Sequence, residues 1–181
     1  MASPTNRTLV SELSRADRLL EVGIGRRPDV ARALAERGCE VIAIDVDEAV
    51  LEMHGEEIGA DDRSCRTCYG DVVTLANAPD PIASLPIDVD AANDDALAEG
   101  RPEDATDETG IDAVYALNLP AELQRPTVDL ARRLDAACSF TTLGFEEPAV
   151  PVRRRSVDGD TLYVAHEHAG ERRRPGGGSE R

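Results

Sequence analysis

The chain has 181 residues, of which 36 are acidic and 20 are basic, so its formal net charge at pH 7 is -16, and every basic residue is an arginine. A charge of this sign repels nucleic acid at long range, which disfavours a general nucleic-acid binder. A surplus of Asp and Glu with arginine in place of lysine is typical of a protein kept soluble in concentrated salt, where the Debye length shrinks to about 3 Å at 1 M, and it predicts a halophilic source, with an acid-rich protein of ordinary cytosol as the alternative.

Apolar segments alternate with helical segments along the chain. Buried strands that alternate with helices form a parallel sheet covered on both faces, so we expect a Rossmann-like, three-layer α/β sandwich. Near the end, two strands flank the dipeptide Asp158-Gly159, which favours a two-residue turn and predicts an antiparallel C-terminal hairpin. The expected strands before it cover residues 18–22, 39–45, 65–71, 111–118 and 138–144, and the expected helices cover residues 28–37, 47–58 and 125–137.

A single domain over residues 1–168 is expected, with one insertion in it. Residues 77–110 hold ten acids and one arginine with hardly any apolar periodicity, which is typical of a disordered segment. We expect solvation in salt to be its role, with docking to a basic partner as the alternative. The tail over residues 169–181 is also expected to be disordered.

Nothing in the sequence predicts a membrane or a metal partner. No apolar run approaches the roughly 20 residues that cross a bilayer, and the N-terminus lacks the apolar core of a signal peptide, so a cytoplasmic location is expected. Four scattered cysteines do not make a disulfide scaffold. Cys65 and Cys68 form a lone CxxC without a second pair, which favours buried thiols over zinc ligands.

The segment LLEVGIG, residues 19–25, places two glycines directly after a strand and before a helix. Gly23 and Gly25 let the backbone turn tightly and approach a ligand without a Cβ in the way. Asp45 ends the second strand, where a carboxylate can accept hydrogen bonds from both ribose hydroxyls. Asp71 ends the third strand, in position to meet the other end of a nucleoside. In a parallel sheet these residues share one edge, which predicts a nucleoside-binding site there.

LLEVGIG, AIDVDE and YGDV resemble the first three motifs of class I S-adenosylmethionine-dependent methyltransferases. The resemblance implies S-adenosylmethionine as the cofactor. In it, Glu21 is the acid that precedes the glycines, the methionine end of the cofactor lies over Gly23 and Gly25, Asp45 binds the ribose, and Asp71 lies near the adenine amino group. A dinucleotide oxidoreductase fits less well, because its fingerprint has a third glycine at the place of Pro28.

EVGIGRRPDVA and YALNLPAELQRP are similar to segments of a family of short, uncharacterised archaeal proteins with this methyltransferase-like fold. The resemblance covers residues 7 to 152 without the acidic insertion, and it implies a fold but no reaction. Arg27 stands where class I enzymes commonly have a glycine. Arg26 and Arg27 suit a carboxylate or phosphate ligand, and the alternative is that they are solvated or pair with Glu21 or Asp29.

ALNLPAEL, residues 116–123, lies where methyltransferases keep their reacting-group motif. Asn118-Leu119-Pro120 resembles the Asn-Leu-Pro core of enzymes that methylate exocyclic or amide nitrogens, in which carbonyl groups hold the target NH₂ and aim its lone pair. Those enzymes have an aromatic residue at the place of Ala121. The alternative is a strand-to-helix turn in which Asn118 caps the helix and Pro120 lies in its first turn.

The function that we expect is binding of S-adenosylmethionine, with methyl transfer to a nitrogen near Asn118 and Pro120. The rival is a non-catalytic binding or interaction module with the same fold. No histidine has a nucleophile partner that predicts a hydrolytic triad. The arginines at 153–155 and 172–174 could contact RNA phosphates, but solvated arginines are favoured in so acidic a chain. The methyl acceptor and the oligomeric state stay open.

Overall fold

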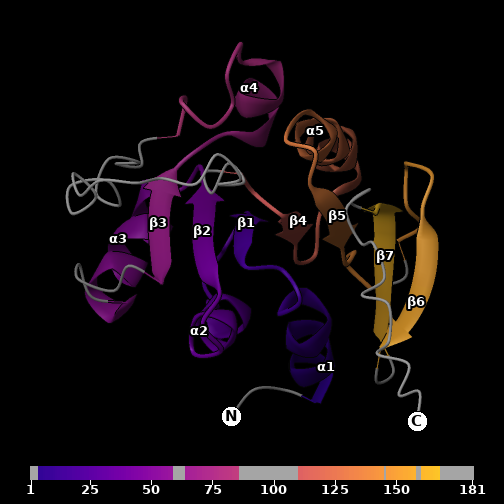
Figure 1. The fold of residues 1–181 in the computed structure, drawn as a ribbon, viewed down its shortest axis with the longest axis horizontal. Coiled ribbons are helices and arrows are strands. Elements are labelled where there is room, and N and C mark those ends of the chain that lie inside the picture. Colours follow the sequence, from indigo (N-terminus) through magenta and orange to yellow (C-terminus); the bar gives the residue numbers. More distant parts are fainter. Residues whose placement is uncertain (1–3, 59–63, 86–109, 145, 158–159, 168–181) are drawn as a thin grey trace, which may run out of the picture.

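One seven-stranded sheet forms the centre of the protein in a computed structural model that describes residues 4–58, 64–85, 110–144, 146–157 and 160–167 (Figure 1). The strand order is β3-β2-β1-β4-β5-β7-β6. Strands β1 to β5 pair in parallel, and β7 is antiparallel to both β5 and β6. The predicted mostly parallel sheet with an antiparallel C-terminal hairpin is therefore confirmed. The strands are β1 (Arg18–Val22), β2 (Glu40–Asp45), β3 (Cys65–Tyr69), β4 (Ala113–Ala116), β5 (Ala137–Phe140), β6 (Arg153–Val157) and β7 (Asp160–His166).

Helices cover both faces of the sheet. Helices α1 (Pro4–Leu13), α2 (Asp29–Ala35) and α3 (Glu48–Ile58) lie on one face, and α4 (Val72–Asn77) and α5 (Ala121–Arg133) lie on the other (Figure 1). Each face has its own apolar core, because side chains alternate between the faces along a strand. Leu19 of β1 packs with α1 and α2, whereas its neighbour Leu20 packs with α4 and α5. The predicted three-layer sandwich is confirmed.

Two of these helices were not predicted from the sequence. Helix α1 buries Leu9, Val10 and Leu13 against the sheet. The third strand was expected to run to Asp71, but it ends at Tyr69, and Asp71 is the N-cap residue of helix α4. Most of the acidic insertion and all of the C-terminal tail lie outside the described residues.

The first part of the expected insertion belongs to the packed domain. Residues 78–85 follow α4 in a series of bends and turns, and Leu85 is buried in the core on the α4 and α5 face. On the same side Arg133 of α5 donates hydrogen bonds to the carbonyl oxygens of Ala76 and Pro79, at 2.7 and 3.0 Å. Leu85 therefore belongs to the packed core on this face of the sheet.

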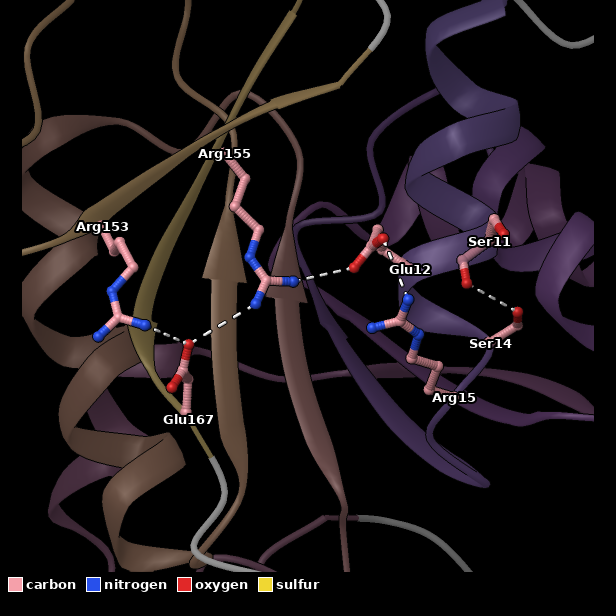
Figure 2. Close-up of polar contacts among 7 residues, drawn as sticks. All are labelled: Ser11, Glu12, Ser14, Arg15, Arg153, Arg155 and Glu167. Carbon is pink, nitrogen blue, oxygen red and sulfur yellow. Dashed lines mark hydrogen bonds and ion pairs between the residues drawn. The ribbon is translucent and has the colours of Figure 1, made fainter. Parts of the chain in front are cut away.

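A chain of alternating charges joins α1 to the C-terminal hairpin (Figure 2). Arg153 contacts Glu167 at 2.9 Å, Glu167 contacts Arg155 at 3.7 Å, Arg155 contacts Glu12 of α1 at 3.0 Å, and Glu12 contacts Arg15 at 3.4 Å. The chain borders a pocket of about 410 Å³ at the amino ends of β4 and β5. This pocket lies at the edge of the sheet opposite to the glycine segment.

Among the described residues, Glu21 of β1 is the one whose carboxyl group is buried in the core. Glu21 is fully buried, and its Oε2 accepts a hydrogen bond of 2.8 Å from the hydroxyl of Tyr115. Burial raises the pKa of Glu21 to about 8; the hydrogen bond from Tyr115 lowers it in part, and the charge of Asp45 raises it further. The group is therefore mostly protonated at neutral pH.

Replacing Leu85 by alanine tests the packing of the segment after α4. The Leu85→Ala change leaves a cavity in the core, and we expect it to lower the free energy of unfolding by about 2–4 kcal/mol. The measurement is urea-induced unfolding in molar potassium chloride. Leu143→Ala is the matched control, because 54% of Leu143 is exposed, and it should change stability by less than about 0.5 kcal/mol. Equal effects of the two changes would contradict the placement of Leu85.

The pH dependence of stability tests the state of Glu21. Its pKa is about 8 in the folded protein and 4.5 in the reference state, so the folded chain binds the extra proton between these values. The contribution of this group to stability is complete below pH 4.5 and is lost as the pH rises toward 8. Between pH 5 and 8, the unfolding free energy of the parent protein should decrease as the pH rises. In Glu21→Gln this decrease should be smaller, by up to about 1.4 kcal/mol per pH unit.

The same series of urea titrations on Glu36→Gln provides the control, because Glu36 is an exposed glutamate on the C-terminal side of α2. That variant should keep the slope of the parent protein. If the unfolding free energy of Glu21→Gln depended on pH as steeply as that of the parent protein, Glu21 would be ionised in the folded state.

Candidate functional site

The residues predicted to bind a nucleoside lie at the carboxyl ends of three neighbouring strands. Gly23 and Gly25 follow β1, Asp45 is the last residue of β2, and Asp71 comes shortly after β3. Asn118 follows β4, on the other side of β1. Since β1 pairs with both β2 and β4, and β2 pairs with β3, these residues share one edge of the sheet, as the sequence predicts.

The segment from Gly23 to Gly25, called the glycine loop below, turns its N–H groups toward β2. Gly23 and Gly25 have φ angles of 72° and 58°, in the left-handed region that glycine adopts without strain. The N–H groups of Gly23 and Ile24 donate to the carbonyl oxygen of Ile44 at 2.8 and 3.3 Å. The N–H of Gly25 donates to Oδ2 of Asp45 at 3.0 Å. Three consecutive backbone donors are thus occupied inside the protein.

His54 of α3 forms a hydrogen bond with the glycine loop. It is fully buried on α3, and its Nε2 lies 2.6 Å from the carbonyl oxygen of Gly25. A carbonyl oxygen only accepts hydrogen bonds, so Nε2 carries the proton. Gly25 is therefore fixed at its N–H by Asp45 and at its C=O by His54. Sequence reasoning missed this role, because the only local signal was a histidine four residues after the buried Val50.

Asp45 keeps acceptor capacity for a ligand. Its Oδ2 accepts from Gly25 and its Oδ1 accepts from the N–H of Asp47 at 3.0 Å. A carboxylate has about four lone-pair sites, so each oxygen can accept one further hydrogen bond. The group can bind a pair of hydroxyls while it anchors the glycine loop.

Asp71 has a structural role that was not predicted. Its Oδ1 accepts from the N–H of Val73 at 2.9 Å, and its Oδ2 accepts from the hydroxyl of Thr74 at 2.8 Å. It thereby caps α4, which is what Asp does well at a helix start. An aspartate followed three residues later by a threonine was the signal available in the sequence.

Exposed apolar residues neighbour the two carboxylates in the chain or in the sheet. Of the large apolar side chains in the described residues, four are strongly exposed: Val46 (60%), Tyr69 (55%), Leu143 (54%) and Val73 (42%). Val46 directly follows Asp45, Tyr69 is the register partner of Asp45, and Val73 lies next to α4's cap. Exposed apolar side chains at one edge of the sheet beside polar groups are typical of a ligand-binding surface.

Asn118 has an unusual backbone. Its φ is 54°, which is uncommon for a residue other than glycine. Its N–H donates to Oγ1 of Thr141 at 2.8 Å, and the N–H of Leu119 donates to the carbonyl oxygen of Thr141 at 2.8 Å. The turn after β4 is therefore fixed to the end of β5.

The side chain of Asn118 does not cap α5. The N-cap residue is Pro120, in an extended conformation and without a side-chain cap. The alternative explanation, in which Asn118 caps the helix and Pro120 lies within its first turn, is thus wrong for both residues. Asn118 is exposed at the candidate edge, with no side-chain hydrogen bond to the described part of the chain.

The other candidates from the sequence do not come together. Within the described ranges, no group of three or more His, Cys, Asp or Glu residues could hold a metal ion. Cys65 is buried, and burial raises the pKa of the Cys68 thiol to about 11. The described helices include none that is long and apolar enough to cross a membrane.

The arginines of β6 are neutralised rather than free. Arg153 and Arg155 belong to the chain of charges of Figure 2. Arg154, on the other face, contacts Glu147 at 2.9 Å and lies over the ring of Tyr163. These arginines therefore do not form an unpaired basic patch that would attract RNA phosphates.

Several solved structures share the fold, among them two that are named as a putative methylase and a putative methyltransferase. A mutant of MtNAS in complex with S-adenosylmethionine matches with a TM-score of 0.56 and 14% identity, over 91% of this chain and 62% of that chain. A putative methylase from Haemophilus influenzae matches with a TM-score of 0.54 and 14% identity, over 90% and 88%. A putative methyltransferase from Escherichia coli matches with a TM-score of 0.54 and 14% identity, over 92% and 86%. At such identities the likeness shows the fold alone, and the predicted methyltransferase-like fold is confirmed.

Sequence comparison adds close relatives. Two UPF0146 proteins from Halobacterium salinarum, strains R1 and NRC-1, are each 39% identical to this chain over 161 residues, 88% of this chain and 95% of the relative. The uncharacterised protein family UPF0146 matches residues 5–66 and 83–168, so the match continues through the hairpin, beyond the residue 152 where the resemblance was expected to end. The expected family of short, uncharacterised archaeal proteins is confirmed, and the chain belongs to UPF0146.

Proposed function

We propose that this protein binds S-adenosylmethionine at the carboxyl ends of β1, β2 and β3. The observation that carries the proposal is the exposed apolar surface of Val46, Tyr69 and Val73 beside Asp45 and Asp71. A purine base would cover that surface, and a ribose would present two hydroxyls to a carboxylate with free lone pairs. The MtNAS structure with the same fold holds S-adenosylmethionine, which supports this choice of ligand.

Within this proposal, each predicted residue has a defined task. Asp45 accepts hydrogen bonds from the ribose hydroxyls, and Asp71 accepts one from the adenine amino group while it caps α4. Gly23 and Gly25 leave room above the loop for the methionine end, because a side chain is absent there. Glu21 precedes the loop in β1, where it is fully buried and hydrogen-bonded to Tyr115.

The reaction that fits this edge is methyl transfer to nitrogen. When bound, the cofactor supplies an electrophilic methyl group on a sulfonium. The exposed Asn118, on a turn fixed by Thr141, would accept a hydrogen bond from an acceptor NH₂ and hold its lone pair in line. As the acceptor nitrogen took the methyl group from the sulfonium, leaving a thioether, it would release one proton to solvent. The rigid conformations of Asn118 and Pro120 support a positioning task.

Calorimetric titration of S-adenosylhomocysteine into the full chain in molar potassium chloride tests the proposal, with NAD as the comparison ligand. We expect micromolar binding of S-adenosylhomocysteine and no binding of NAD. Asp45→Ala should weaken the binding at least tenfold, about 1.4 kcal/mol, because the ribose loses its acceptor. The far-ultraviolet circular dichroism should not change.

Asp47→Ala is the matched control, since Asp47 is a neighbouring carboxylate that bonds the N–H of Ala49. It should bind as the parent protein does. If Asp45→Ala and Asp47→Ala bound S-adenosylhomocysteine with equal affinity, Asp45 would not contact the ribose. If the parent protein did not bind S-adenosylhomocysteine, the proposal would be rejected. Binding without methyl transfer to amine or amide acceptors would identify the non-catalytic binding module.

A further inference from the structure

Most described arginines of this acidic protein have a partner. Arg26 and Arg27, directly after the glycine loop, are exposed and have no hydrogen bond or ion pair with a described residue. The anticipated pairing with Glu21 or Asp29 is absent, because Glu21 is buried against Tyr115 and Asp29 forms no ion pair within the described ranges. By contrast, arginines that bond a carboxylate include Arg15, Arg18, Arg66, Arg132, Arg153, Arg154 and Arg155.

Several backbone N–H groups near these arginines are not available to bind an anion. The N–H groups of residues 23–25 are occupied by Ile44 and Asp45, and Pro28 has no N–H. Helix α2 after it has only seven residues and starts with the acidic Asp29. The guanidinium groups of Arg26 and Arg27 therefore supply the positive charge that an anion would meet beside this loop.

We infer that Arg26 and Arg27 form a binding site for an oxyanion, a carboxylate or a phosphate, beside the glycine loop. A guanidinium is a planar fork that matches the two oxygens of either group. The preceding residue Gly25 is fixed by Asp45 and His54 at 3.0 and 2.6 Å, so the backbone that carries the arginines starts from a fixed point. Both cations stay unneutralised among the described residues although the chain carries a net charge of -16.

The oxyanion has two sources at this edge. One is the carboxylate at the methionine end of the cofactor, and this source rests on the proposed function. The other is an anionic group of the methyl acceptor or of another substrate, which does not depend on the identity of the cofactor. The two sources share one chemistry and differ in which ligand loses affinity when the arginines are removed.

The first experiment titrates inorganic pyrophosphate into the full chain at constant molar potassium chloride and follows the Nε–Hε resonances of the arginines. The double variant Arg26→Ala/Arg27→Ala should weaken the binding at least tenfold. Arg26→Lys/Arg27→Lys should bind between the parent and the alanine variant, because lysine keeps the charge and loses the fork. Arg7→Ala is the control: Arg7 is an exposed arginine of α1 without a partner among the described residues, and its loss should leave the affinity within twofold.

The second experiment compares S-adenosylhomocysteine with 5′-methylthioadenosine, which has no carboxylate. If the arginines bind the cofactor, the double alanine variant should lose at least tenfold in affinity for S-adenosylhomocysteine and keep its affinity for methylthioadenosine. If both nucleosides keep their affinity and pyrophosphate binding is lost, the site takes the anion of another substrate.

Two results would overturn the inference. One is unchanged affinity of the double alanine variant for both pyrophosphate and S-adenosylhomocysteine, and the other is absence of binding of both by the parent protein. Failure of the proposed function gives a different pattern. In that case neither nucleoside binds, while pyrophosphate still binds and requires Arg26 and Arg27.

Discussion

Strand β1 is hydrogen-bonded on both sides, to β2 and β4, and four of its five residues are buried. An ionised carboxylate in such a place would lose its hydration without compensation. Glu21 therefore exists there mainly as a neutral acid that accepts the hydroxyl of Tyr115. Strand β1 ends one residue after Glu21, and the glycine loop and the candidate site follow directly from that end.

The glycine loop is held by side chains that come from elsewhere in the sequence. Asp45 of β2 and His54 of α3 fix the two polar groups of Gly25, and the carbonyl of Ile44 accepts from the residues before it. A loop fixed in this way loses little freedom when a ligand arrives, which favours binding. Under the proposed function Asp45 would have two tasks, since the group that anchors the loop would also bind the ribose. A defect at Asp45 would affect both the shape of the loop and the ligand's hydrogen bonds.

The sequence predicted the parts that depend on local patterns. The apolar runs marked β1 to β5, and Asp158-Gly159 marked the hairpin, because burial and turn chemistry are properties of neighbouring residues. The contacts that define the site are different. His54 meets Gly25 from 29 positions away, and Tyr115 meets Glu21 from 94. No periodicity encodes such pairs, so the roles of His54 and Thr141 and the neutral state of Glu21 required the structure. Asp71 was placed correctly at the edge, but its capping of α4 was overlooked.

In concentrated salt the arginines of this protein interact only over short distances. In molar salt the Debye length is about 3 Å, so only charges in direct contact influence each other strongly. The paired arginines of β1, β3 and β6 meet this condition through contacts such as Arg155 with Glu12 at 3.0 Å. Arg26 and Arg27 cannot attract a ligand from a distance under these conditions. Their selectivity would depend on the fit of two planar forks to two oxygens, which a fixed loop provides and a long-range field does not.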